Sequence, residues 1–228
     1  MSMAAGAGRF GDGPLSRIAA LVYTVLAVEI LLLVTTVPGL VPLVLLDRDA
    51  SNLPLVAACA LPLGPAISAA LYALHHRSAD VTDLRPAAAF WRGYRANLRE
   101  ALLIWVPWLA WMTVVAVSLA NFEAAAVPGW WAVLLVVIAV ASTLWLANAL
   151  VIASLFAFRI ADVARLAAYF LVRTKGVTLA NACLLIVAAG LTVYLSEAVL
   201  ALVGSVLALM LVRNARPMIA AVQEEFTR

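Results

Sequence analysis

Charged side chains are scarce throughout this sequence. Aspartate, glutamate, lysine and arginine make up only 12% of the 228 residues, whereas 66% are hydrophobic. Soluble domains average about 25% charged and about 45–50% apolar residues, and a water-soluble fold of this length cannot bury the excess. No stretch is both long enough and polar enough to form a separate soluble domain. The composition therefore predicts a polytopic membrane protein.

Cysteine and histidine are also nearly absent, and each shortage argues against a class of site. Cys59 and Cys183 lie inside apolar segments without a neighbour at a metal-ligand spacing, so we interpret both as small hydrophobes. The only histidines, His75 and His76, are adjacent, whereas a catalytic zinc needs three protein ligands. No nucleophile with a base and an orienting group is visible. The sequence thus predicts no enzyme, no metal site and no cofactor.

Motifs for nucleotides and nucleic acids are missing as well. The sequence has no Walker motif and no Gly-rich phosphate loop after a strand, so the chain is not expected to be an ATPase. It also lacks the Glu-Ala-Ala-to-Gly pattern with which ABC permease subunits contact their ATPase. The isoelectric point near 9.2 does not indicate nucleic acid, because the basic residues flank apolar segments. Membrane proteins use that placement to fix their orientation.

The long apolar segments predict the number of membrane spans, since a crossing helix needs about 20 apolar residues. The candidate spans lie near residues 18–40, 53–74, 101–120, 130–158, 178–194 and 198–212. The last two divide one long apolar segment at Ser196-Glu197. The expected fold class is all-α, a polytopic transmembrane helix bundle of about six spans, with five as the alternative. Residues 1–14 are expected to be a disordered tail, and 15–228 a single transmembrane domain.

The placement of basic residues predicts the topology. With six spans and a cytoplasmic N-terminus, fourteen of the fifteen basic residues face the cytoplasm, and only Arg48 lies outside. With five spans, the last three basic residues would also lie outside. We therefore expect six spans and both termini in the cytoplasm.

An arginine-rich segment precedes the third predicted span. Arg92, Arg95 and Arg99 fall within about 60° of one another on a helix, and Trp91 and Tyr94 supply interfacial contacts nearby. This pattern predicts a cytoplasmic amphipathic helix that leads into the membrane. The arginines would either anchor the helix at lipid phosphates or form a docking surface for a cytoplasmic partner. The sequence favours the anchor.

The second predicted span contains Pro62, Gly64 and Pro65 close together, followed by small residues. A proline removes a backbone donor and kinks the helix, and neighbouring helices must then satisfy the freed carbonyl groups. Small residues let another helix approach closely. The sequence therefore predicts a kinked helix that packs tightly, with Tyr72 near its end.

Two polar residues lie within predicted spans. Glu29 is about midway along the first span, where an ionisable group is costly and suggests function. The alternative is a protonated or hydrogen-bonded side chain that faces the bundle. Asn148 lies deep in the fourth span, where an amide can hold helices together by hydrogen bonds.

Two arginine-containing loops resemble each other. Arg85 and Arg165 each precede a phenylalanine by five residues, and a basic stretch, an asparagine and an apolar segment follow. The similarity suggests either two related three-span halves or the same anchor chemistry used twice. We favour the second interpretation.

Two blocks of this sequence resemble the YesL family of small bacterial integral membrane proteins. The first block contains Gly64, Pro65, Ala66, Ala70, Leu71 and Tyr72, and the second contains Phe90, Trp91, Arg92, Tyr94, Arg95 and Asn97. The resemblance extends from about the first span to the last. It departs at Glu29, because first spans of the family often carry an amide residue there.

The resemblance implies a role beside a transporter. Members of the family are commonly associated with carbohydrate-uptake systems of the ABC type. The expected function is therefore a non-enzymatic accessory or scaffold protein in a bacterial cytoplasmic membrane, with the lipid bilayer and carbohydrate transporter subunits as partners. The alternative is an autonomous small-solute transporter with a midplane site around Glu29 and Asn148.

Overall fold

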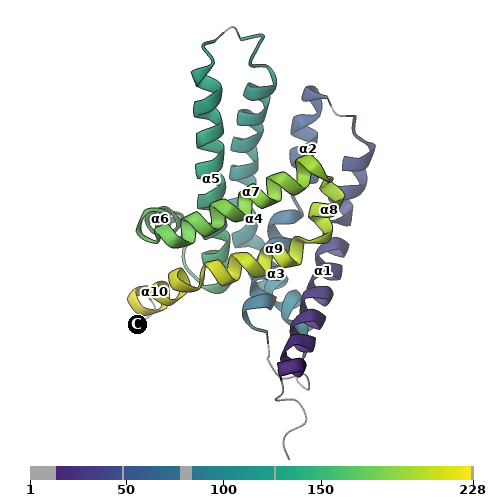
Figure 1. Ribbon diagram of the computed structural model, residues 1–228, viewed down its shortest axis with the longest axis vertical. Helices are drawn as coiled ribbons and strands as arrows, with labels where there is room; N and C mark the ends of the chain where they lie inside the picture. Colours follow the sequence, from purple (N-terminus) through teal and green to yellow (C-terminus); the bar gives the residue numbers. More distant parts are fainter. Residues whose placement is uncertain (1–13, 48, 78–83, 126, 227–228) are drawn as a thin grey trace, which may run out of the picture.

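A computed structural model describes residues 14–47, 49–77, 84–125 and 127–226 of the protein, and it confirms the all-α prediction. Within these ranges the regular elements are helices and no strand is present (Figure 1). They are α1 (Pro14–Leu45), η1 (Ala50–Asn52), α2 (Leu53–Cys59), α3 (Leu63–His75), α4 (Pro86–Ala120), α5 (Trp130–Leu155), α6 (Ile160–Arg173), α7 (Lys175–Tyr194), α8 (Glu197–Leu202), α9 (Gly204–Asn214) and α10 (Arg216–Phe226). The tail predicted for residues 1–14 lies outside the described residues, except for Pro14.

In the described part of the chain, four single helices are long and apolar enough to cross a membrane: α1, α4, α5 and α7. Two further candidates are bent pairs. η1 and α2 join α3 at an angle of 43°, and α9 joins α10 at 50°. The helices therefore account for four to six spans, a range that includes the five or six predicted.

The first five predicted spans correspond to helices or to parts of them. α1 continues through Pro38 and Pro42 beyond the predicted end at residue 40. The predicted amphipathic helix and third span form one continuous α4 of 35 residues, about 52 Å long. α5 ends at Leu155, three residues before the predicted end at 158.

The last predicted span, 198–212, is not one helix. It is divided at Val203 between α8 and α9, and α9 is continued by α10. In Figure 1, α1, α4 and α5 run along the long axis, whereas α7, α9 and α10 run across it. The C-terminal helices thus cross the bundle instead of extending it by two parallel spans.

The centre of the bundle is α3, which contacts α1, α4, α5 and α9. Its alanines at 66, 69, 70 and 73 are almost completely buried, together with Leu71 and Leu74. Small side chains allow several helix backbones to approach α3 at once, because they occupy little space between the axes. The run of small residues in the sequence therefore forms the most tightly packed part of the fold.

Large apolar side chains cover the outside of the described helices. Examples are Ile30 on α1, Val133 on α5 and Ile186 on α7, which are exposed by 62%, 65% and 71%. A soluble protein would leave such a surface in water at a high free-energy cost. The exposed apolar helices fit a multi-pass membrane protein whose outer surface contacts lipid.

Candidate functional site

The helix of the second predicted span is bent by 43°, and a side chain of α4 contacts the break. The helix breaks after Cys59 and resumes at Leu63, with Pro62 as its N-cap residue. Trp105 of α4 donates a hydrogen bond from its indole Nε1 to the carbonyl oxygen of Ala60, at 2.9 Å. A carbonyl group at a helix break needs such a partner, because the membrane interior supplies no water.

Replacing Trp105 with phenylalanine should therefore destabilise the protein by about 1–2 kcal/mol. The change preserves much of the buried ring but removes the donor to Ala60, and one buried hydrogen bond is worth about 0.5–1.5 kcal/mol. Reversible unfolding in mixed micelles measures this difference. Trp130→Phe is the matched control, because that side chain is 58% exposed. Equal loss from both substitutions would contradict the assigned role of Trp105.

Two glycines lie at the interface between α3 and α4. A Cβ atom built on Gly64 of α3 would lie 2.4 Å from Cγ of Trp105, and one built on Gly93 of α4 would lie 2.7 Å from Cβ of Tyr72. Each helix therefore uses a glycine to accommodate an aromatic side chain of the other. Tyr72, which we predicted to be a packing residue, packs against Gly93. Gly93 was not among the predicted packing residues.

Hydrogen bonds extend this interface to α5. Ser68 and Ser154 share a hydrogen bond between their hydroxyl groups, at 2.8 Å. The amide of Asn97 donates to the carbonyl oxygen of Ser154, at 3.0 Å. Residues from α3, α4 and α5 thus meet at one point, and Asn97 of the second block has a structural role there.

Arg92, Arg95 and Arg99 form an exposed surface on the first half of α4, which we call the arginine face. No hydrogen bond or ion pair joins these three side chains to another of the described residues. Tyr94 is half-buried and stacks on the buried ring of Phe90, with the ring centroids 6.3 Å apart. The aromatic residues therefore hold this part of α4 against the bundle, while the three arginines remain exposed.

Glu29 is buried at the contact between α1 and α9. Its side chain is only 8% exposed, and Oε2 accepts a hydrogen bond from the backbone N–H of Ser205, at 2.6 Å. Ser205 lies in the first turn of α9, where backbone N–H groups have no partner within the helix. Glu29 therefore caps α9 from another helix, and the predicted alternative of a hydrogen-bonded glutamate facing the bundle describes its position.

Asn148 is buried where α5 contacts α6. Its Nδ2 donates to the carbonyl oxygen of Ala167, at 3.4 Å. This contact matches the prediction that the amide holds helices together. Glu29 and Asn148 belong to different helix pairs, and no hydrogen bond connects them in the described part of the chain.

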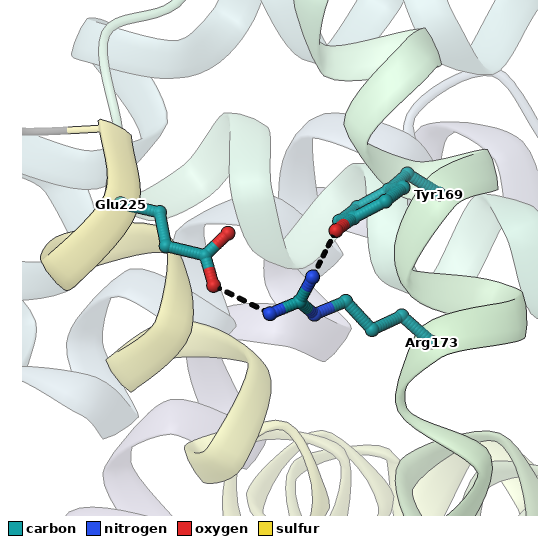
Figure 2. Close-up of polar contacts among 3 residues, drawn as sticks. All are labelled: Tyr169, Arg173 and Glu225. Carbon is teal, nitrogen blue, oxygen red and sulfur yellow. Dashed lines mark hydrogen bonds and ion pairs between the residues drawn. The ribbon is translucent and has the colours of Figure 1, made fainter.

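The helices α6 and α10 were not predicted as elements of their own, and an exposed ion pair connects them. Figure 2 shows Arg173 of α6 between Glu225 of α10 and Tyr169 of its own helix. Nη2 of Arg173 lies 2.8 Å from Oε1 of Glu225, and Nη1 donates to the hydroxyl group of Tyr169. Both charged side chains are exposed, so the pair contributes at most about 1 kcal/mol. The pair connects the last residue of α6 to the end of α10.

A cavity of about 310 Å³ opens beside α4, α5 and α6. Its lining is almost entirely apolar and includes Trp108, Trp111 and Trp145, together with Pro107 and Ser142. The apolar lining fits a lipid chain better than a hydrated solute, because it offers few hydrogen-bonding groups.

Within 14–47, 49–77, 84–125 and 127–226, no three His, Cys, Asp or Glu side chains gather as a metal site would require. Both Cys59 and Cys183 are free thiols. No protein-family model, curated protein or solved structure matches this chain. The fold and the exposed apolar helices define the class as a helical, multi-pass membrane protein.

Proposed function

We propose that this chain is a non-enzymatic accessory or scaffold component of a bacterial carbohydrate uptake system of the ABC type. It would lie in the cytoplasmic membrane with both termini in the cytoplasm. The observation that carries the proposal is the arginine face of α4, which is exposed and without a partner among the described residues. The choice of a carbohydrate importer as the partner rests on the resemblance to the YesL family.

The arginine face has the chemistry of a docking surface. Arginine presents several donors in a planar group that can bind carboxylates through two hydrogen bonds at once. Trp91, exposed by 40%, lies beside Arg92 and Arg95 on the same part of α4. Arginine and tryptophan are among the residues that contribute most to binding energy at interfaces. Lipid phosphates would neutralise the arginines that a partner leaves free.

The intramembrane polar residues support a scaffold more than a transport path. Glu29 bonds to the backbone of α9, and Asn148 bonds to the backbone of α6. A side chain that binds a transported solute must be able to exchange its partner, whereas these two groups hold helices together. The transporter alternative would have to use the two buried oxygens that have no hydrogen-bond partner among the described residues, Oε1 of Glu29 and Oδ1 of Asn148.

A pull-down from native membranes tests the proposal. The chain would be tagged at its C-terminus, solubilised in a mild detergent and analysed by mass spectrometry for co-purifying subunits. We expect sugar-importer subunits with the unaltered chain and at least a tenfold lower recovery, as an order-of-magnitude estimate, with R95E/R99E. The variant leaves Arg92 in place, because that residue also lines a separate cavity.

A matched variant provides the control. R159E/R165E makes the same change in charge at two exposed residues at the start of α6 and should leave recovery unchanged. Purification of the chain without any transporter subunit would contradict the proposal. Equal loss of partners from both variants would show that net charge, and not the arginine face, determines the association.

A further inference from the structure

A second cavity lies where the end of α3 meets the start of α4, against α1. Its volume is about 300 Å³. It is lined by Thr24, Ala73, His76, Arg77, Leu84, Arg85, Pro86, Ala88, Ala89 and Arg92. These residues come from three separate helix segments, so the cavity forms only when α1, α3 and α4 are assembled.

The polar part of this lining is basic. His76, Arg77, Arg85 and Arg92 contribute to the wall, and none of the lining residues that the structure describes is acidic. Burial, together with the nearby guanidinium groups of Arg216 and Arg213, lowers the pKa of Arg77 from the usual value of an arginine. The cavity thus lies within a cluster of positive charges.

Several hydrogen-bond donors are available to a ligand. Arg85 and Arg92 are exposed, and neither forms a hydrogen bond or ion pair with another residue that the structure describes. Nδ1 of His76 donates a hydrogen bond to the carbonyl oxygen of Tyr72, at 3.0 Å, which orients the ring at the cavity. Nη1 of Arg77 donates to the carbonyl oxygen of Leu74, at 3.2 Å, which fixes its guanidinium group at the cavity.

The first turn of α4 adds a favourable electrostatic contribution. α4 begins with Pro86, and the preceding Arg85 provides no side-chain cap. The N-terminus of a long helix carries a partial positive charge and backbone N–H groups without helical partners. Both features favour an anion, and here they coincide with four basic side chains around one cavity.

We propose that this cavity binds a phosphate-bearing anion. A phosphate group has the charge and the acceptor oxygens to bind several arginines at once. The cavity volume is at the lower end of the range for small-molecule sites, so a phosphate with a small substituent fits it. The phosphate belongs either to the headgroup of an anionic lipid or to a free phosphate compound. The cavity shares Arg92 with the arginine face, but binding of an anion there does not require the partner proposed above.

Binding measurements on the purified full chain test the site and distinguish the two sources. Inorganic phosphate would be titrated by calorimetry in a mild detergent, and phosphatidic acid would be compared with phosphatidylcholine by native mass spectrometry. Binding of inorganic phosphate supports the site with a free phosphate as its ligand. Binding of phosphatidic acid alone supports it with a lipid headgroup. Binding of neither to the unaltered chain overturns the proposal.

Paired variants localise the binding. R85Q/R92Q should weaken it at least about tenfold, because each charge-assisted hydrogen bond contributes that much to affinity. R95Q/R99Q removes the same charge from the same helix outside the cavity and should bind as tightly as the unaltered chain. R85K/R92K keeps the charge and should bind more tightly than R85Q/R92Q but less tightly than the unaltered chain. It replaces the glutamine variant in the test if that variant does not fold. Equal loss from R85Q/R92Q and R95Q/R99Q overturns the proposal.

The segment between Arg77 and Leu84 contains two carboxylates, Asp80 and Asp83, outside the described residues. The D80N/D83N variant should bind phosphate at least as tightly as the unaltered chain. If this variant binds phosphate and the unaltered chain does not, Asp80 and Asp83 occupy the basic side chains in the unaltered chain. That result would overturn the proposal.

Discussion

Replacing Gly64 with leucine should destabilise the protein by more than about 4 kcal/mol and leave little folded chain in the membrane. Even the first added atom, Cβ, would lie 2.4 Å from Cγ and 2.7 Å from Cβ of Trp105. These atoms are close to the backbone of α4, so rotation of the indole ring cannot relieve the overlap. α3 and α4 would have to separate, and the hydrogen bond from Trp105 to Ala60 would be lost with them.

Gly190 provides the control for this substitution. It lies within α7, and a Cβ built on it has nothing within 4 Å, so Gly190→Leu should change the stability by less than about 1 kcal/mol. Unfolding in mixed micelles and the yield of monodisperse protein measure the difference between the two variants. A Gly64→Leu chain as stable as the Gly190→Leu chain would contradict the close contact between α3 and α4.

This contact shows which part of the fold could be predicted from local sequence. Pro62 and Pro65 predict a kink because proline acts on its own helix. The group that satisfies the kink could not be predicted, since Trp105 is 45 residues away from Ala60 and several tryptophans were equally plausible donors. The sequence thus predicted the need for a partner but not its identity.

The helices α6 and α10 were missed for different reasons. For α6, the buried residues Val163, Ala167 and Phe170 recur at helical spacing, so a signal was present. The charged residues around them favoured the interpretation of a loop. For α10, the last predicted span ended at residue 212, where Arg213 and Arg216 follow the apolar segment. Pro217 is the second residue of α10, and proline is well tolerated in the first turn of a helix.

The similarity between the two arginine-containing loops has a partial structural counterpart. Phe90 and Phe170 are both completely buried, and each lies on an amphipathic helical segment that leads to an apolar one. In the first case the two segments form the continuous α4, whereas Thr174 separates α6 from α7 in the second. Burial of the phenylalanine explains the shared pattern without a common origin of the two halves.

The division at Val203 could not be predicted from its neighbours. Residues 198–212 contain no proline and no charge, and Gly204 alone weakens the helix there. The backbone N–H of Ser205, in the first turn of α9, instead finds an acceptor in Glu29, 176 residues away. The buried Glu29 and the helix break at Val203 therefore belong to the same contact between α1 and α9.

Replacing Glu29 with leucine should consequently destabilise the protein by about 2–4 kcal/mol. The substitution removes the hydrogen bond and leaves the N–H of Ser205 without a partner in apolar surroundings. Glu29→Gln keeps an acceptor oxygen at the same place and should cost only about 1 kcal/mol. Glu123→Gln, at an exposed position in the turn after α4, is the control for loss of a carboxylate.

Unfolding in mixed micelles would rank these variants, and hydrogen exchange at residues 204–207 would show whether the first turn of α9 opens. The same variants separate the two functional hypotheses. A helix cap predicts that Glu29→Gln is nearly as stable as the unaltered chain and still captures its partners. A transport site predicts that the same variant is stable but loses solute flux in proteoliposomes. Stability of Glu29→Leu equal to that of the unaltered chain would contradict the cap, and the buried carboxylate would then need a ligand to explain it.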